Sequence, residues 1–119
     1  MSPETWARAK PLLQAALDRS PGPETLADVQ ADLVSGDAQL WCSETAAVVT
    51  QTPGDGSVHV WLAGGSLETF PALFRSCAAW ARVQGCDRMT VEGGRRGWTR
   101  VLAPLGFTAD DDNGLVTRL

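Results

Sequence analysis

The fold is decided by the stretch VHVWLA-GG, in which a predicted strand at Val58–Ala63 runs directly into Gly64-Gly65. A long amphipathic helix follows. A second predicted strand, Arg88–Glu92, ends at Gly93-Gly94 and leads through a short helix to Leu105-Gly106-Phe107. Two strands separated by one helix, with glycines at each strand exit, predict a βαβ unit. The rest of the chain is expected to cover this unit and extend its edges.

The first strand is expected to be central in its sheet. Strand side chains alternate, so Val58, Val60 and Leu62 are expected to face one side, and His59 and Trp61 the other. Apolar side chains on both faces predict a strand that is covered by other elements on both sides of the sheet.

The long helix is limited by Pro71, which a helix tolerates only in its first turn. Either Ser66 or Thr69 is therefore expected to cap it, and Gly85 ends it. Its core-facing stripe recurs at helical spacing and consists of Leu67, Phe70, Leu73, Phe74, Cys77, Ala78 and Ala81.

Two helices are predicted before the sheet. Ser2-Pro3-Glu4 is typical of a helix start, and Pro11 is expected to kink or split this first helix. The second helix covers residues 24–35 and stops at Gly36.

Further strands flank the βαβ unit. Residues 38–43 and 46–52 predict a tight hairpin, and the Pro/Gly-rich turn after it adds Val58–Ala63 as the third strand of a meander. After the short helix, which is expected at about 98–105, residues 107–110 and 115–118 predict a final hairpin.

The composition is ordinary for a single soluble globular domain spanning 1–119, with 44% hydrophobic and 20% charged residues. The net charge of −4 argues against bulk nucleic-acid binding, which needs a dense positive field. No apolar run approaches the roughly 18–20 residues that cross a bilayer, and no secretory signal is recognisable. We therefore expect no membrane association and a cytoplasmic location.

No metal site is predicted. Cys42, Cys77 and Cys86 lack metal-ligand spacing, and His59 is the only histidine. Cys77 is expected to be a small buried hydrophobic residue. Asp110-Asp111-Asp112 is either a cation site or, more simply, the solvated tip of the last hairpin.

The element order resembles that of the GNAT acyltransferase superfamily. The motifs that carry the resemblance are Ala79-Trp80-Ala81-Arg82-Val83-Gln84-Gly85-Cys86, at the end of the long helix, and Leu102-Ala103-Pro104-Leu105-Gly106-Phe107. The resemblance implies an α/β (α+β) fold with a mixed, splayed sheet. Two N-terminal helices would cover one face, a long central helix would pack opposite them, and a short helix would lie near the C-terminus.

The resemblance also implies a place for acetyl-CoA between the two splayed parallel strands. Its pyrophosphate would lie at the start of the long helix, where free N–H groups favour an anion. The loop departs from the superfamily's basic pattern, because it is short and carries Glu68, which would repel a phosphate. If CoA binds, the residues expected to contact it are Leu62 and Ala63 along pantetheine, and Gly64, Gly65 and Ser66 at the pyrophosphate.

The catalytic residues of the superfamily are largely absent. The tyrosine that often protonates the leaving thiolate falls on Leu102, and the chain contains no tyrosine. A general base would have to be Glu92, His59 or a water molecule. The sequence therefore assigns no catalytic residue.

One basic cluster stands out in this acidic chain. Arg95, Arg96 and Arg100 surround Trp98. The cluster is either a partner-binding surface, since Arg and Trp are frequent hot-spot residues, or a solvated helix end with Trp98 in the core. Similarly, the five tryptophans are either interface anchors or parts of a Trp-rich core.

The sequence favours a non-catalytic protein that binds no cofactor. It is similar to small GNAT-like proteins encoded among the structural genes of tailed phages and prophages. The leading prediction is a phage-type structural or virion-associated protein, located in the host cytoplasm or the virion. Its partners would be other subunits of the particle, bound through Arg95, Arg96, Trp98 and Arg100.

The alternative is a divergent acetyl-CoA-dependent N-acetyltransferase, and a third hypothesis is a small regulator of a host protein. The residues that carry the phage resemblance are Gly36, Leu40-Trp41, Gly64-Gly65, Trp80-Ala81, Gly85-Cys86 and Glu92-Gly93-Gly94-Arg95-Arg96-Gly97-Trp98.

Overall fold

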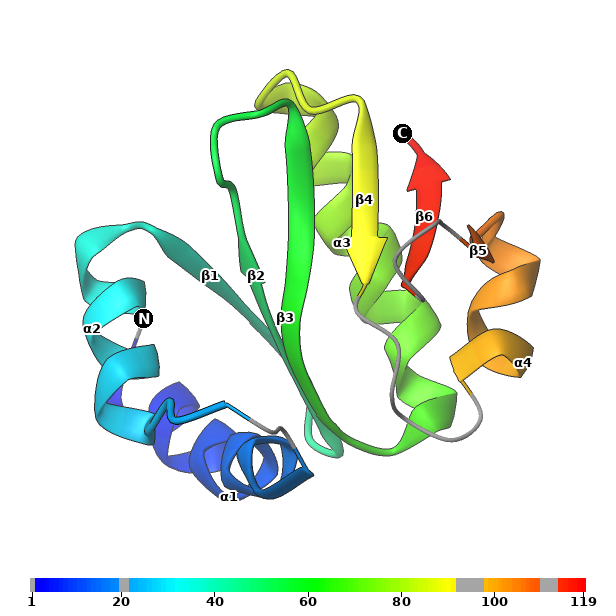
Figure 1. Ribbon diagram of the computed structural model, residues 1–119. Coiled ribbons are helices and arrows are strands. Elements are labelled where there is room, and N and C mark those ends of the chain that lie inside the picture. The colour runs from blue at the N-terminus through cyan, green and yellow to red at the C-terminus, as the bar shows by residue number, and fades with distance from the viewer. Residues whose placement is uncertain (1, 20–21, 92–97, 110–113) are drawn as a thin grey trace.

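The strand that carries VHVWLA lies in the middle of a mixed sheet, as predicted. The computed structural model describes residues 2–19, 22–91, 98–109 and 114–119 (Figure 1). The described strands form one six-stranded sheet in the order β1-β2-β3-β4-β6-β5. The strand bounds are β1 Ala38–Cys42, β2 Ala46–Gln51, β3 Ser57–Gly65, β4 Arg88–Val91, β5 Thr108–Ala109 and β6 Leu115–Arg118.

Helices cover both faces of the sheet. One core packs α1 and α2 against β1, β2 and the end of β3, and the other packs α3 and α4 against the opposite face (Figure 1). This arrangement confirms the predicted architecture. Among the described residues, no helix is both long enough and apolar enough to cross a membrane. The helix bounds are α1 Pro3–Arg19, α2 Leu26–Ser35, α3 Phe70–Val83 and α4 Trp98–Leu102, with short 3₁₀ turns η1 Leu67–Thr69 and η2 Ala103–Leu105.

Of the two effects expected of Pro11, a split of the first helix is wrong, because α1 is continuous from Pro3 to Arg19, and a kink stays a prediction. A proline removes the hydrogen bond to the carbonyl four residues earlier, which here is that of Ala7. Both Pro11 and Ala7 are exposed, so water can satisfy the freed carbonyl. The helix therefore tolerates its proline on the solvent side.

The second helix ends at Ser35 as predicted, but it begins at Leu26, two residues later than expected, with Thr25 as its N-cap. Thr25 and Asp28 form a capping box, in which the Thr25 N–H donates to Asp28 Oδ2 at 2.8 Å and the Asp28 N–H donates to Thr25 Oγ1 at 3.4 Å. Gly36 ends the helix with a φ of 90°, a left-handed conformation that glycine adopts without steric cost.

A β-bulge in β3 overturns the expected alternation of its side chains. Val49 lies opposite Leu62, whereas Thr50 lies opposite Val60, so Trp61 is an extra residue in the β2–β3 ladder. Val60 packs in the α3 core, and Leu62 packs in the α1/α2 core. The prediction that Leu62 shares a face with Val60 is therefore wrong, since the bulge shifts the pattern by one residue.

Four of the five tryptophans contribute to the two cores. Trp41 and Trp80 meet edge to face, with ring centroids 5.8 Å apart, and pack on the α3 side. Trp6 and Trp61 are half-buried on the α1/α2 side. The Trp-rich core is thus confirmed for these four, while the side chain of Trp98 lies outside the described part.

Candidate functional site

The two parallel strands separate partway along their length. β3 pairs with β4 from Ser57, opposite Arg88, to Val60, opposite Val91. Beyond Val60, β3 continues to Gly65 with β2 as its partner, and no other described strand pairs with this segment. In Figure 1, β3 continues past the end of β4 toward the start of α3. Beyond Val60, this edge of β3 therefore has no strand partner among the residues that the structure describes, as the predicted splay requires.

Ala63 directs its backbone polar groups toward this unpaired edge. The Ser66 N–H donates to the Thr45 carbonyl at 2.9 Å, which fixes the phase of the antiparallel β2–β3 ladder. Because hydrogen-bonded pairs alternate along such a ladder, Leu62 and Gly64 bond to β2, whereas the N–H and C=O of Ala63 point away from it.

An arginine from α1 reaches the edge of β3. Arg19 Nη2 donates a hydrogen bond to the Ala63 carbonyl oxygen at 3.1 Å, in a partly buried position. The contact joins residues 44 positions apart in the sequence, so no local motif could have revealed it. It places a permanent positive charge beside the segment that the sequence predicts to contact pantetheine.

The two loop glycines have packing roles that need no ligand. A Cβ on Gly64 would lie 2.0 Å from the carbonyl oxygen of Leu12 in α1, and a Cβ on Gly65 would lie 2.1 Å from that of Thr45. Gly65 also has a φ of +105°, which favours glycine. The phosphate cradle at Gly64, Gly65 and Ser66 stays a prediction. The packing alone is enough to require both glycines.

The long helix begins without a side-chain cap. Neither Ser66, before η1, nor Thr69, before α3, makes a capping hydrogen bond, so the expectation that one of them caps the helix is wrong. The Thr69 hydroxyl instead bonds to the Thr45 hydroxyl at 2.8 Å. Within the described part, the backbone N–H groups of Leu67 and Glu68 have no acceptor. Two donors are thus free at the positive end of the helix.

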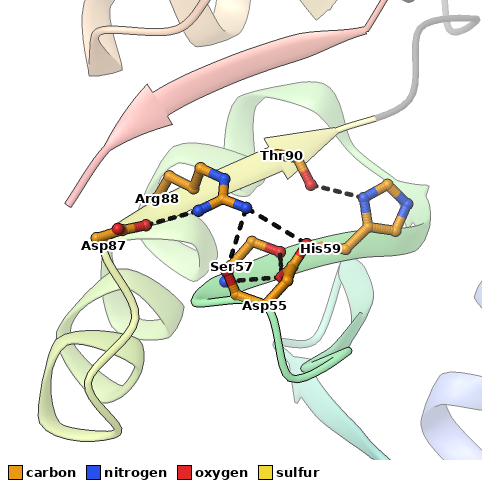
Figure 2. Close-up of polar contacts among 6 residues, drawn as sticks. All are labelled: Asp55, Ser57, His59, Asp87, Arg88 and Thr90. Atoms are coloured by element: carbon orange, nitrogen blue, oxygen red, sulfur yellow. Dashed lines mark hydrogen bonds and ion pairs between the residues drawn. The ribbon is translucent and has the colours of Figure 1, made fainter.

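His59, the histidine weighed as a general base, lies in the paired part of the two strands. Its Nδ1 is 2.7 Å from Thr90 Oγ1 (Figure 2), and the two residues are partners in the parallel ladder. The splay begins one pair later, after Val60 and Val91. His59 is therefore held beside the start of the splay, and its catalytic role stays a prediction.

An ion-pair cluster ties the β2–β3 turn to the start of β4 (Figure 2). Arg88 lies 3.3 Å from Asp55 and 2.9 Å from Asp87. Asp55 also accepts hydrogen bonds from the Ser57 hydroxyl and N–H, and these bonds, with a smaller contribution from Arg88, lower the pKa of Asp55 below its ordinary 3.8. The charged side chains of the cluster are thus paired with one another, and we assign the cluster a structural role.

The remaining predicted residues divide between buried, exposed and undescribed positions. Leu102, where the superfamily's tyrosine would fall, is fully buried in the α3 core. Arg100 is exposed on α4. Outside the described residues lie Glu92, Gly93, Gly94, Arg95 and Arg96, the side chain of Trp98, and the aspartates at 110–112.

The cysteines behave as hydrophobic residues. Cys77 is fully buried in the α3 core, and burial raises the pKa of its thiol to about 11. Cys42 and Cys86 are half-buried and free. Across the residues that the structure describes, no group of three or more histidine, cysteine or acidic side chains is arranged to hold a metal ion.

Comparison with solved structures identifies the fold. A GCN5-related N-acetyltransferase from Kribbella flavida superposes with a TM-score of 0.70 at 14% identity, covering 100% of this chain and 95% of that one. An IAA acetyltransferase from Bacillus cereus superposes with a TM-score of 0.62 at 12% identity, covering 92% of this chain and 91% of that one. A protein described as an N-acetyltransferase from Lactobacillus plantarum superposes with a TM-score of 0.65 at 16% identity, covering 99% of this chain and 93% of that one. No family model matches the sequence, and no curated protein matches it. The chain therefore has the fold of GNAT acetyltransferases.

Proposed function

We propose that this protein binds an acyl-CoA and acts as a divergent N-acyltransferase. The observation that carries the proposal is the edge of β3 beyond Val60, which has no partner among the described strands and leads to the start of α3. The N-acetyltransferases with this fold add support, because their chains are covered almost completely. We therefore favour the N-acetyltransferase, which was the alternative in the sequence analysis, over the phage-type structural role, which was the leading prediction.

The strand edge suits the pantetheine arm of CoA. Pantetheine carries amide groups, and a strand edge offers the complementary backbone donors and acceptors. Here the N–H and C=O of Ala63 point toward the unpaired side. Arg19 already donates to this carbonyl, so an incoming amide N–H must displace the guanidinium or share the acceptor with it.

The start of α3 suits a phosphate, although not through the residues that the sequence favours. The Ser66 N–H already donates to Thr45, and Gly64 bonds to β2 in the ladder. Among the described residues, the N–H groups of Leu67 and Glu68 are donors without an acceptor. Together with a displaced Arg19, they would supply the positive potential that a pyrophosphate needs. The exposed Glu68 carboxylate opposes it.

The chain supplies binding and orientation more than proton transfer. An acyl-CoA would supply the thioester from which an acyl group passes to an amine. With no tyrosine in the sequence and Leu102 sealed in the core, we assign the proton transfers to water. His59, beside the start of the splay, is the described side chain best placed to orient that water.

Isothermal titration with acetyl-CoA tests the proposal. We expect a Kd of about 1 mM or tighter, within the usual range of substrate affinities. Glu68→Gln is expected to strengthen binding about twofold to threefold by removing a like charge, whereas Glu4→Gln, on the exposed start of α1, should leave it unchanged. Absence of binding at about 5 mM acetyl-CoA, with the protein folded, rejects the proposal.

A second candidate is a non-catalytic protein with this fold, including the phage-type structural or virion-associated role. It is favoured by Gly64 and Gly65, which pack too closely against α1 and β2 to form an open cradle. This candidate predicts no response to acetyl-CoA and self-association or assembly with other subunits. Sedimentation velocity would test it, because a monomer that binds acetyl-CoA contradicts it.

A further inference from the structure

A hollow lies against α3, and none of the residues of β3 lines it. Its volume is about 220 Å³, and it lies where α3, β4, β6 and the segment after α4 meet. Phe74, Met89 and Phe107 form its apolar floor, and all three are buried. An apolar cavity of about 150 Å³ already accommodates benzene, so this hollow has room for one aromatic ring and a small substituent.

Two arginines of α3 flank the hollow. Arg75 and Arg82 are seven residues apart and lie on one helix face with Ala78 between them, and all three residues line the hollow. Ala78 is small, which is one reason that the space between the arginines is not filled. Both arginine side chains are exposed at the rim.

These guanidinium groups have no protein partner among the residues that the structure describes. Arg88 is matched by Asp55 and Asp87, whereas Arg75 and Arg82 make neither ion pairs nor hydrogen bonds there. In a chain of net charge −4, these two arginines and Arg118, which also lines the hollow, are complementary to an anion with an apolar body. A guanidinium binds a carboxylate through paired hydrogen bonds.

We propose that this hollow binds a small aromatic carboxylate. The ring would contact Phe74, Met89 and Phe107, and the carboxylate would lie at the rim between Arg75 and Arg82. The hollow is smaller than the roughly 300–1,000 Å³ of drug-sized sites, which limits the ligand to about one ring. This site is separate from the β3 edge and does not depend on acyl-CoA binding.

Benzoate and benzamide are the matched probes, because they share size and shape but differ in charge. We expect benzoate to bind about fivefold to tenfold tighter than benzamide, as two partly exposed charge contacts allow. Binding is measured by chemical-shift changes of backbone amides, and those of Ala78 and Thr117 should move. Added salt should weaken benzoate and leave benzamide unchanged.

Matched variants separate the charge from the hollow. Arg75→Gln and Arg82→Gln should each weaken benzoate about threefold and leave benzamide unchanged, and Arg100→Gln on α4 should affect neither. Ala78→Leu should abolish both by filling the hollow, whereas the exposed Ala79→Leu on the same helix should not. The proposal is overturned if benzoate fails to bind at about 50 mM, if both probes bind equally, or if the arginine variants leave benzoate unchanged.

Discussion

Gly64→Ala is expected to destabilise the fold, because α1 crosses β3 at this residue. A Cβ on Gly64 would lie 2.0 Å from the carbonyl oxygen of Leu12 and 2.8 Å from its carbonyl carbon. Both are backbone atoms of a regular helix, so they cannot rotate away as a flexible side chain would. The φ of Gly64 lies outside the left-handed region, and the expected effect is therefore steric alone.

The magnitude follows from what α1 buries. The helix would have to withdraw by roughly 1 Å or more to restore ordinary contact, and a gap of this size forfeits about a quarter to a half of the dispersion attraction. The side chains affected are Ala9, Leu13, Ala16 and Leu17, which are buried against the sheet. Each buried leucine is worth roughly 1.5–3 kcal/mol. We expect the free energy of unfolding to fall by about 2–3 kcal/mol.

Thermal unfolding followed by circular dichroism measures the loss. For a domain of this size 1 kcal/mol corresponds to about 4 °C, so the Tm should fall by about 8–12 °C. Gly54→Ala is the control, because its Cβ would meet nothing within 4 Å although its φ is +92°. An alanine in this left-handed conformation costs about 1 kcal/mol, or about 4 °C. A Tm loss for Gly64→Ala no larger than that of Gly54→Ala would refute the close approach of α1.

Three further predictions concern charge and chemistry. Arg19→Gln should weaken acetyl-CoA binding about fivefold and reduce its dependence on salt, whereas Arg8→Gln on the same helix should not; unchanged affinity in Arg19→Gln would exclude Arg19 from the site. Asp55→Asn should lower the free energy of unfolding. The difference from wild type should be largest near neutral pH and should shrink as the pH falls below 3.8. The reason is that a lowered pKa in the folded state stabilises the fold only while the carboxylate is ionised; urea unfolding at several pH values measures this, and a loss that is constant with pH contradicts it. Finally, native protein at pH 8 should react with a thiol reagent at Cys42 and Cys86 before Cys77, whose raised pKa leaves almost no thiolate, and a fast phase that disappears in Cys77→Ser would show the assignment to be wrong.

Local signals in the sequence were sufficient for the element order, whereas the splayed strand pair was expected from the resemblance to the GNAT superfamily. Strand alternation, a proline near the start of the long helix and glycines at the turns are local signals, and each acts within a few residues. The β-bulge at Trp61 had no such signal, because its neighbours Val60 and Leu62 are apolar and suit either face of a sheet covered on both sides. Alternation alone therefore assigned Leu62 to the wrong core.

The candidate site was predicted less completely, for a different physical reason. Gly64-Gly65 before a helix suggested a phosphate loop, yet the same residues are required by backbone atoms of Leu12 and Thr45 that approach from other elements. Arg19 was missed because its partner is 44 residues away. A glycine shows that something lies close to the backbone, but it does not show whether that neighbour is a ligand or another part of the chain.

The bulge, the close approach of α1 and the splay are parts of one arrangement. The bulge turns Leu62 toward α1, and Gly64 lets the helix backbone come into contact with β3 just beyond it. β2 and α1 thus hold the end of β3, and the described pairing of β3 with β4 ends at Val60 and Val91. Within the described residues, the edge of β3 beyond Val60 is therefore unpaired. A ligand that docks there need not separate the strands, and the main rearrangement it requires is displacement of the Arg19 hydrogen bond to Ala63.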